Sequence, residues 1–321
     1  MRGVAAIAVL LCHAATHVDL AFGTPTLRAV MRPGHNGVDL FFVLSGFLLL
    51  LIHHRDIGRP RSVTRYAWRR VRRIYPVYWL ALACTIAVTL AGGHGWPAPG
   101  RVILSILLWP RTTPPLHPLA WTLQYEVLFY LFFALLLLHR ILGLVTIALW
   151  LLAILTAQFV PLGGGLATNI FAIEFFFGMG TAHILRIRRP GPRLAAWVAA
   201  VGATAFLSAW ALEAAGLLYG YGFTARLLYG LSAAALIGGA AGSEGLVRWP
   251  RALIGIGQAS YAIYLFHLIG IGVAWQIGLR LGVALPPLIW FVLLTIAGAL
   301  LGGMVHLAIE RPLIAWMRRR G

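Results

Sequence analysis

The chain has 321 residues, of which 60% are hydrophobic and only 11% are charged. A soluble domain is typically about half apolar and a quarter charged, so this composition excludes an ordinary water-soluble fold. The net charge of +18 comes from 26 arginines without a single lysine. Because these arginines gather between apolar stretches, they indicate membrane topology and argue against nucleic-acid binding.

Ten apolar stretches are candidates for crossing a hydrocarbon core, which takes about 20 helical residues. They occupy residues 3–21, 38–52, 75–91, 119–138, 141–160, 168–187, 194–212, 226–242, 253–275 and 285–309. We therefore predict an all-α fold, a polytopic transmembrane helix bundle of about ten spans. We expect residues 1–321 to form one domain without an appended soluble domain. A shorter apolar piece at 102–109 is expected to lie along the membrane interface or to re-enter the membrane.

The arginines also orient this bundle. If the N-terminus is cytoplasmic, the other 20 arginines lie inside and only six lie in outer segments, namely Arg28, Arg32, Arg101, Arg111, Arg226 and Arg280. The positive-inside rule then places both termini in the cytoplasm. The arginine-only usage and the abundance of Ala, Gly and Leu hint at a GC-rich genome. We expect an integral protein of a bacterial cytoplasmic membrane.

The first span carries two histidines. His13 follows Gly3 by ten residues, about 15 Å along a helix, and so lies near mid-membrane. Ionisable groups at that depth are costly and usually functional. A neutral imidazole there could act as a general base, and the alternative is a buried histidine with one structural hydrogen bond. His17 lies one turn further on the same face, but no third metal ligand is evident, so we predict no metal site and place His17 at the outer mouth.

Three acids fall inside or at the start of apolar stretches. Asp39, in "GHNGVDLFF", either complements the dipole of a first helical turn or orients a nearby histidine. Glu126, in "WTLQYEVLFYL", lies about 10 Å along its span and needs a partner, which could be an arginine, a histidine or a substrate hydroxyl. Glu174, in "FAIEFFFGMG", is a further buried acid with either a structural or a substrate-lining role.

The ninth span presents a polar stripe. Ser260, Tyr264 and His267 recur at helical spacing on one face, and His267 lies near mid-membrane, so Tyr264 and His267 are candidates for lining a substrate path. Ser45, in "VLSGF", lacks the first glycine of a nucleophile elbow. We interpret that Ser-Gly pair as a site of close helix packing.

Four arginines stand within five positions in "AWRRVRRIYPVYW", residues 67–79. Arg70 and Arg73 are three apart and share a helix face, as do Arg69 and Arg72. Excess charge beside a span satisfies topology alone, and anionic lipid heads are a second explanation. A third is a phosphate ligand, because guanidinium groups bind phosphate oxygens bidentately.

The fragments "RGVAAIAVLLCHA", "GHNGVDLFFVLSGFLL", "RRVRRIYPVYW", "WTLQYEVLFYL", "SYAIYLFHL" and "ERP" occur in this order from residue 2 to about 312. In this order they resemble the acyltransferase 3 family of integral membrane acyltransferases. The resemblance implies transfer of an acyl group, usually acetyl, from cytoplasmic acyl-CoA to a hydroxyl of a sugar, a cell-surface glycan or a lipid-linked saccharide. The family's first-span histidine matches His13, its R-x-x-R motif matches Arg70 and Arg73, and its acids match Asp39 and Glu126.

The resemblance further implies acyl-CoA as co-substrate, a hydroxyl-bearing glycan as partner and no permanently bound cofactor. Arg69, Arg70 and Arg73 would then bind the phosphates of CoA at the cytoplasmic face. One alternative is acylation of a small secondary metabolite such as a macrolide. Another is a transporter or flippase, since buried acids and broken spans are typical of transporters as well, although no clear inverted repeat is visible.

Overall fold

The computed structural model describes residues 1–160, 165–245 and 250–319, and these residues form helices and connecting turns without a strand. Short helices flank the spans: α2 (Pro25–Met31), α5 (Pro99–Ile106) and α13 (Arg311–Arg319). The longer helices are α1 (Arg2–Phe22), α3 (Gly37–His53), α4 (Val63–Ala91), α6 (Ala120–Leu138), α7 (Arg140–Thr156), α8 (Ile173–Ile187), α9 (Pro192–Ala214), α10 (Phe223–Gly242), α11 (Arg251–Arg280) and α12 (Pro287–Val305).

The prediction of an all-α polytopic membrane protein is confirmed. Among the described residues, nine helical segments are long and apolar enough to cross a membrane. The remaining predicted span, 141–160, corresponds to the 17-residue helix α7, which lies at the lower limit of about 17 residues for a span. Arg248 and Arg320, which are predicted to be cytoplasmic, lie outside the described residues.

Two boundaries differ from the prediction in a way that matters for function. Helix α4 begins at Val63, well before the expected start of the third span at residue 75, so the whole arginine cluster is helical. The apolar piece at 102–109 contains the end of α5, an eight-residue helix, followed by a turn. The segment from α5 to the start of α6 lies at the outer end of the bundle in the orientation predicted from the arginines.

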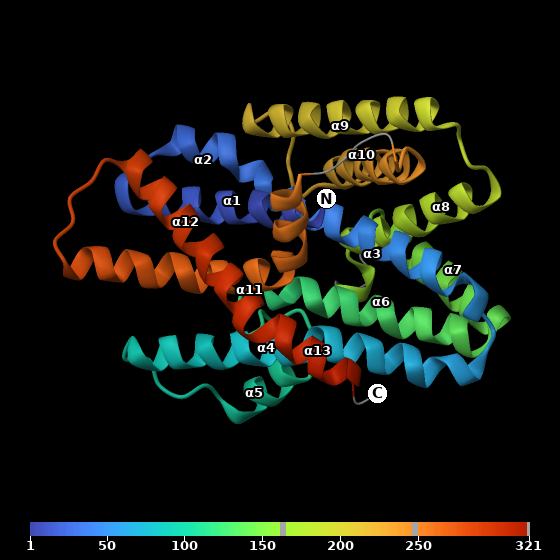
Figure 1. Cartoon of the computed structure of the whole chain (residues 1–321), viewed down its shortest axis with the longest axis horizontal. Helices are drawn as coiled ribbons and strands as arrows, with labels where there is room; N and C mark the ends of the chain where they lie inside the picture. The colour runs from blue at the N-terminus through green and yellow to red at the C-terminus, as the bar shows by residue number, and fades with distance from the viewer. Residues whose placement is uncertain (161–164, 246–249, 320–321) are drawn as a thin grey trace.

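The helices pack in layers that are visible in Figure 1, with α9 along one edge of the bundle and α4 with α5 along the opposite edge. Helix α10 packs against α9, α3 against α8, and α11 against both α1 and α12. The α3–α8 contact depends on Gly46 and Gly178, where an added Cβ would collide with the backbone of Phe175 and Val43. Small residues allow such close approach of membrane helices, which is the role predicted for the Ser45–Gly46 pair.

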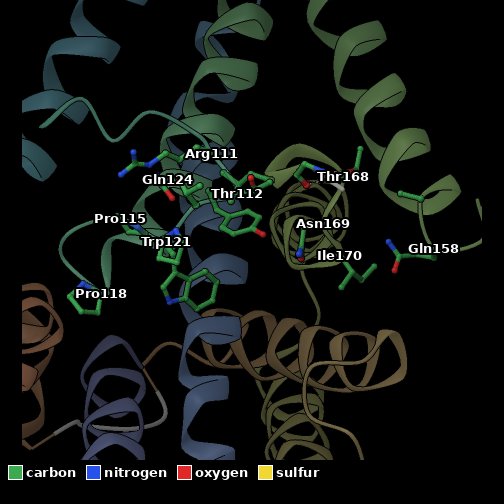
Figure 2. Close-up of a pocket in the computed structure, with 16 residues that line it drawn as sticks. Arg111, Thr112, Pro115, Pro118, Trp121, Gln124, Gln158, Thr168, Asn169 and Ile170 are labelled. Atoms are coloured by element: carbon green, nitrogen blue, oxygen red, sulfur yellow. Dashed lines mark hydrogen bonds between the residues drawn. The ribbon is translucent and has the colours of Figure 1, made fainter. Parts of the chain in front are cut away.

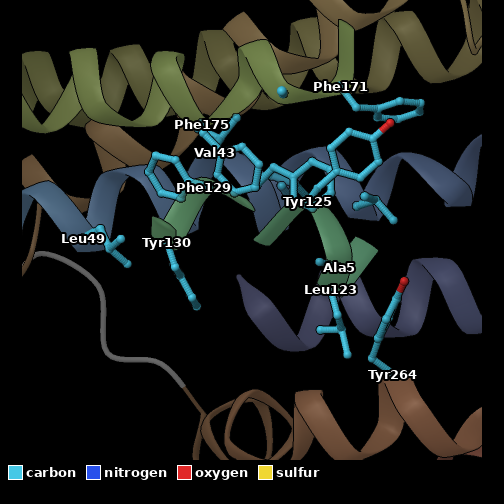
Figure 3. Close-up of a cluster of buried hydrophobic side chains, with 14 of the residues drawn as sticks. Ala5, Val43, Leu49, Leu123, Tyr125, Phe129, Tyr130, Phe171, Phe175 and Tyr264 are labelled. Atoms are coloured by element: carbon cyan, nitrogen blue, oxygen red, sulfur yellow. The ribbon is translucent and has the colours of Figure 1, made fainter. Parts of the chain in front are cut away.

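An aromatic cluster fills the space between α3, α6 and α8 (Figure 3). The rings of Phe129 and Phe175 stack with centroids 4.3 Å apart, and Phe42 packs on Phe175 at 4.7 Å. Helix association in lipid is driven by close packing and polar contacts, since lipid tails are as apolar as the side chains. This interlocked cluster therefore holds α6 in a defined rotation, with Glu126 on one face and Trp121 on another.

Helices α1 and α11 run parallel in a fixed register. A Cβ on Gly3 would lie 2.9 Å from the backbone nitrogen of Gly257, so the two helices touch near their N-terminal ends. Ten residues further along each helix stand His13 and His267, which therefore reach the same depth, about 15 Å from that contact. This register brings the two imidazoles together.

Candidate active site

A pair of histidines, His13 and His267, lies about halfway along α1 and α11. Nδ1 of His13 is 3.1 Å from Nε2 of His267, and the ring centroids are 5.1 Å apart. His267 is fully buried, whereas His13 is partly exposed. The sequence prediction identified both residues but did not pair them.

The hydrogen bonds of the pair define which nitrogen carries a proton. Nδ1 of His267 is 3.1 Å from the carbonyl oxygen of Ile263, and a carbonyl only accepts, so this nitrogen is protonated and Nε2 of His267 holds a lone pair. Nδ1 of His13 lies 3.0 Å from the carbonyl oxygen of Val9 as well as beside that lone pair, so it must donate. The remaining nitrogen of His13, Nε2, therefore holds a lone pair and is a base.

A narrow cavity of about 50 Å³ lies between α1, α3, α6 and α11. Its lining includes Thr122, Glu126 and Tyr264. The hydroxyls of Tyr264 and Thr122 are 2.8 Å apart, and the Tyr264 ring lies 6.1 Å from that of His267, so Tyr264 lies between the cavity and the histidine pair. This volume is enough for ordered water but not for an acyl thioester, so the cavity must widen to admit a substrate.

Glu126 projects into this cavity and is held by two hydroxyl groups. Tyr130 donates a short hydrogen bond to Oε1 of Glu126, and Oγ of Ser45 lies 3.3 Å from the same oxygen. We expected an arginine, a histidine or a substrate hydroxyl as the partner. In the described part of the chain the hydrogen-bonding partners are these two protein hydroxyls.

Asp39 lies in the first turn of α3, as the first of its two predicted roles required, and its partner is an arginine. Both of its carboxylate oxygens lie 2.6 Å from NH1 of Arg226, and both residues are fully buried. Glu174 lies 3.6 Å from the same guanidinium and is also fully buried, away from the lining of the cavity. The structure thus places Asp39 and Glu174 beside the buried guanidinium of Arg226 and not beside His13. The physical reason is that an unpaired buried charge is costly.

Asn36 extends this polar cluster from Arg226 to Glu213. Its amide oxygen accepts a short hydrogen bond from Arg226, and its amide nitrogen donates to Glu213 over 2.8 Å. Glu213 also lies 3.0 Å from His35 and accepts a hydrogen bond from Tyr229. The network ties α3, α9 and α10 together, and Arg226, which the topology argument placed in an outer segment, is its buried centre.

The arginine cluster of α4 is linked to the cavity by Tyr130. The guanidinium of Arg70 lies over the rings of Tyr66 and Tyr130, 5.7 and 5.5 Å from their centroids. Nε of Arg70 is buried without a hydrogen-bond partner among the described residues. Because the Tyr130 hydroxyl also binds Glu126, one side chain separates the arginine from the acid.

The other two predicted arginines differ in exposure. Arg69 is exposed, and Arg73 is partly buried, within electrostatic range of Tyr261 in the cavity wall. His17, predicted at the outer mouth, packs edge-on against Trp275 with centroids 5.2 Å apart. Within the described residues no group of three His, Cys, Asp or Glu side chains could hold a metal ion.

A family model described as an acyltransferase domain matches residues 1–307. The chain belongs to this acyltransferase family. It is 33% identical over 320 residues to the "Exopolysaccharide production protein ExoZ" of Rhizobium meliloti (strain 1021), and the match covers 91% of this chain and 95% of that protein. It is 32% identical over 143 residues to the "Putative acetyltransferase ORF330" of Acidianus two-tailed virus, covering 44% and 40% of the two chains. No solved structure matches the chain.

The family membership makes the protein an integral membrane acyltransferase, so it is an enzyme and the transporter interpretation is set aside. The structure adds residues that sequence reasoning missed, above all Tyr130, Arg226 and Glu213. Arg226 and Glu213 could have been predicted from the sequence, because a charged residue within an apolar helix needs a buried partner. No local sequence pattern indicates a role for Tyr130, because that role depends on the neighbouring side chains of α3 and α4.

Proposed function

We propose that this acyltransferase moves an acetyl group from cytoplasmic acyl-CoA to a hydroxyl of a cell-surface glycan or lipid-linked saccharide, in the cytoplasmic membrane of a bacterium, with His13 as general base. The observation that carries the proposal is the hydrogen-bonded histidine pair, in which His267 leaves Nε2 of His13 with a lone pair. The names of the two relatives, one in exopolysaccharide production and one a putative acetyltransferase, support a glycan acceptor and an acetyl donor.

The donor side of the proposal rests on the arginines of α4. CoA carries a pyrophosphate and a 3′-phosphate, and guanidinium forks bind such groups bidentately. Arg69 is exposed, and Arg70 has an unsatisfied Nε and a guanidinium plane held on two tyrosine rings. With phosphates bound by Arg69, Arg70 and Arg73, the pantetheine arm would pass Tyr130 and Glu126 toward the histidine pair.

In the transfer step, Nε2 of His13 accepts the proton of the acceptor hydroxyl while that oxygen attacks the thioester carbonyl carbon. The new C–O bond forms, the C–S bond breaks, and the proton passes from His13 to the departing thiolate of CoA. While His13 is an imidazolium, its Nδ1–H donates to the neutral Nε2 of His267, which stabilises the charge. Glu126 accepts from hydroxyl groups in the structure and would orient the acceptor hydroxyl in the same way.

The same lone pair would also serve a relay, in which His13 attacks the thioester first and passes the acyl group on. In the relay the acyl group becomes bonded to Nε2 of His13 and CoA leaves before the acceptor binds. Acid quenching followed by mass spectrometry of the peptide that contains His13 separates the two routes, because only the relay adds an acetyl group to that peptide.

The test of the proposal is release of CoA thiol by the purified protein in lipid nanodiscs, with acetyl-CoA and an acceptor glycan. His13→Ala is expected to lower kcat by about 10²- to 10⁴-fold, the usual contribution of a general base. His183→Ala, at an exposed histidine of α8, is the matched control and should retain full activity. Near-normal turnover by His13→Ala would refute the assignment of the base.

A further inference from the structure

A second cavity, of about 590 Å³, lies at the outer end of α6. The loop before α6 and the first turns of α6 form one wall, and the end of α7 with the segment 165–170 forms the other. Figure 2 shows Arg111, Trp121 and Gln124 on one side and Gln158, Thr168 and Asn169 on the other. The volume falls in the range of about 300–1,000 Å³ that is typical of small-molecule sites.

The amide groups of this outer cavity offer both donors and acceptors. The side-chain nitrogens of Gln124 and Gln158 donate to backbone carbonyls, over 2.7 and 2.9 Å, which leaves their oxygens available as acceptors. The oxygen of Asn169 accepts from the backbone nitrogen of Phe171, which leaves its nitrogen as a donor. Because each sugar hydroxyl both donates and accepts, such a mixed set suits a saccharide.

An aromatic platform accompanies the amides. The ring of Trp121 packs against Phe171 and Tyr125, with centroids 5.3 and 5.9 Å apart, and the residue remains partly exposed at the cavity. An indole presents a large, rigid apolar face with a polar edge. The apolar C–H face of a sugar ring can stack on such a surface while its hydroxyls reach the amides.

Arg111 adds a positive charge to the same cavity. Its NH2 group donates to Oγ of Ser105 over 3.2 Å, and its Nε is buried without a hydrogen-bond partner among the described residues. Among the lining residues there is no carboxylate to neutralise it. A partly buried guanidinium without a counter-ion favours a ligand that supplies one, such as a carboxylate or a phosphate group.

The loop that carries Arg111 is anchored before any ligand binds. Oγ of Ser105 also accepts a hydrogen bond from the backbone nitrogen of Leu116. The backbone carbonyl of Ser105 accepts one from the hydroxyl of Tyr78 over 2.6 Å. Leu108, fully buried, has a φ of 52°, a left-handed conformation that residues other than glycine rarely adopt. The surrounding contacts hold this backbone in place, so the cavity is preformed.

Helix α6 joins this cavity to the candidate active site. At 3.6 residues per turn, Trp121, Gln124 and Tyr125 share one face of the helix, and Thr122 and Glu126 lie on a different face. Trp121 and Glu126 are separated by about 7.5 Å along the helix axis. A ligand in the outer cavity would therefore lie beside the helix that carries Glu126.

We propose that the outer cavity binds a saccharide that bears a carboxylate or phosphate group, with the anion on Arg111 and a sugar ring on Trp121. This assignment rests on the proposed function in one respect, that the saccharide is the acceptor of the acyl group. Binding itself requires no turnover and is measurable without a donor.

The test is isothermal titration of the full chain in nanodiscs with three probes: an oligosaccharide that contains glucuronic acid, a neutral glucose oligosaccharide of equal length, and inorganic phosphate. Arg111→Gln is expected to weaken binding of the acidic oligosaccharide at least about tenfold and to leave the neutral one almost unchanged. Trp121→Leu is expected to weaken both oligosaccharides, and Trp121→Phe to restore part of the loss. Arg101→Gln, at an exposed arginine of α5 outside the cavity, is the matched control.

Competition by phosphate against the acidic oligosaccharide, lost in Arg111→Gln, would support the anion site. Phosphate binding without any saccharide binding would overturn the proposal, and so would equal losses in Arg111→Gln and Arg101→Gln. Acyl-CoA binding measured on each variant reports that the bundle is intact. If the saccharides bind as expected but no CoA thiol is released, the proposed reaction fails while the cavity assignment stands.

Discussion

Replacing His267 tests whether this buried histidine supports His13 during catalysis. The two imidazoles share one hydrogen bond of 3.1 Å, and His267 makes its other hydrogen bond to the backbone of its own helix. When His13 takes up a proton, this becomes a hydrogen bond from a charged donor, worth about 1.5–3 kcal/mol. His267→Leu should therefore lower kcat by about 10- to 150-fold, less than the loss expected for His13→Ala.

The assay is initial-rate release of CoA thiol in nanodiscs, with acetyl-CoA and acceptor varied separately. Because the arginines of α4 are unchanged, KM for acetyl-CoA should stay within about twofold while kcat falls. His267→Gln keeps a side-chain oxygen that can accept from Nδ1 of His13 and should restore part of the rate. If the role of His267 were purely structural, His267→Leu and His267→Gln would lower kcat to the same extent. That outcome, or an unchanged kcat, would refute the reasoning.

Three further predictions concern the donor, the buried ion pair and pH. Arg70→Ala should raise KM for acetyl-CoA more than about tenfold and leave KM for the acceptor unchanged, whereas Arg59→Ala, at an exposed arginine, should change neither. Arg226→Met leaves Asp39 buried without its cation and should destabilise the protein by about 3–5 kcal/mol, seen as a lower thermal midpoint in detergent. His117 lies outside the spans, and burial lowers its pKa to about 4, so stability should fall by about 3 kcal/mol as pH decreases from about 6.5 to 4.

The sign of the pH effect follows from proton uptake. Between pH 6.5 and 4 the unfolded chain binds a proton at His117 and the folded chain does not, so acid favours unfolding in that window. His117→Gln should flatten the dependence of the thermal midpoint on pH, and an equally steep profile would contradict the assignment. If Arg70→Ala changed KM for the acceptor only, Arg70 would not bind the donor. If Arg226→Met left the thermal midpoint unchanged, the buried ion pair would not stabilise the protein.

The sequence alone determined the fold class, most of the spans and the family. A lipid bilayer imposes one thickness on every crossing helix and forces backbone hydrogen bonds to close within it, so apolar length predicts spans directly. Residues 119–138, expected as a span, are helical from Ala120 to Leu138. The motif order from the first span to "ERP" was specific enough to identify the acyltransferase family that the comparison confirmed.

Only the tertiary structure decided which polar groups meet. His13 and His267 are 254 positions apart and meet because α1 and α11 pack in register at Gly3. Asp39, predicted either to complement the dipole of a first helical turn or to orient a histidine, lies in the first turn of α3 and pairs with Arg226 on α10, because a buried guanidinium needs a carboxylate beside it. Spacing along one helix reports which side chains share a face, but the neighbour across that face depends on interhelical packing, and no local pattern encodes it.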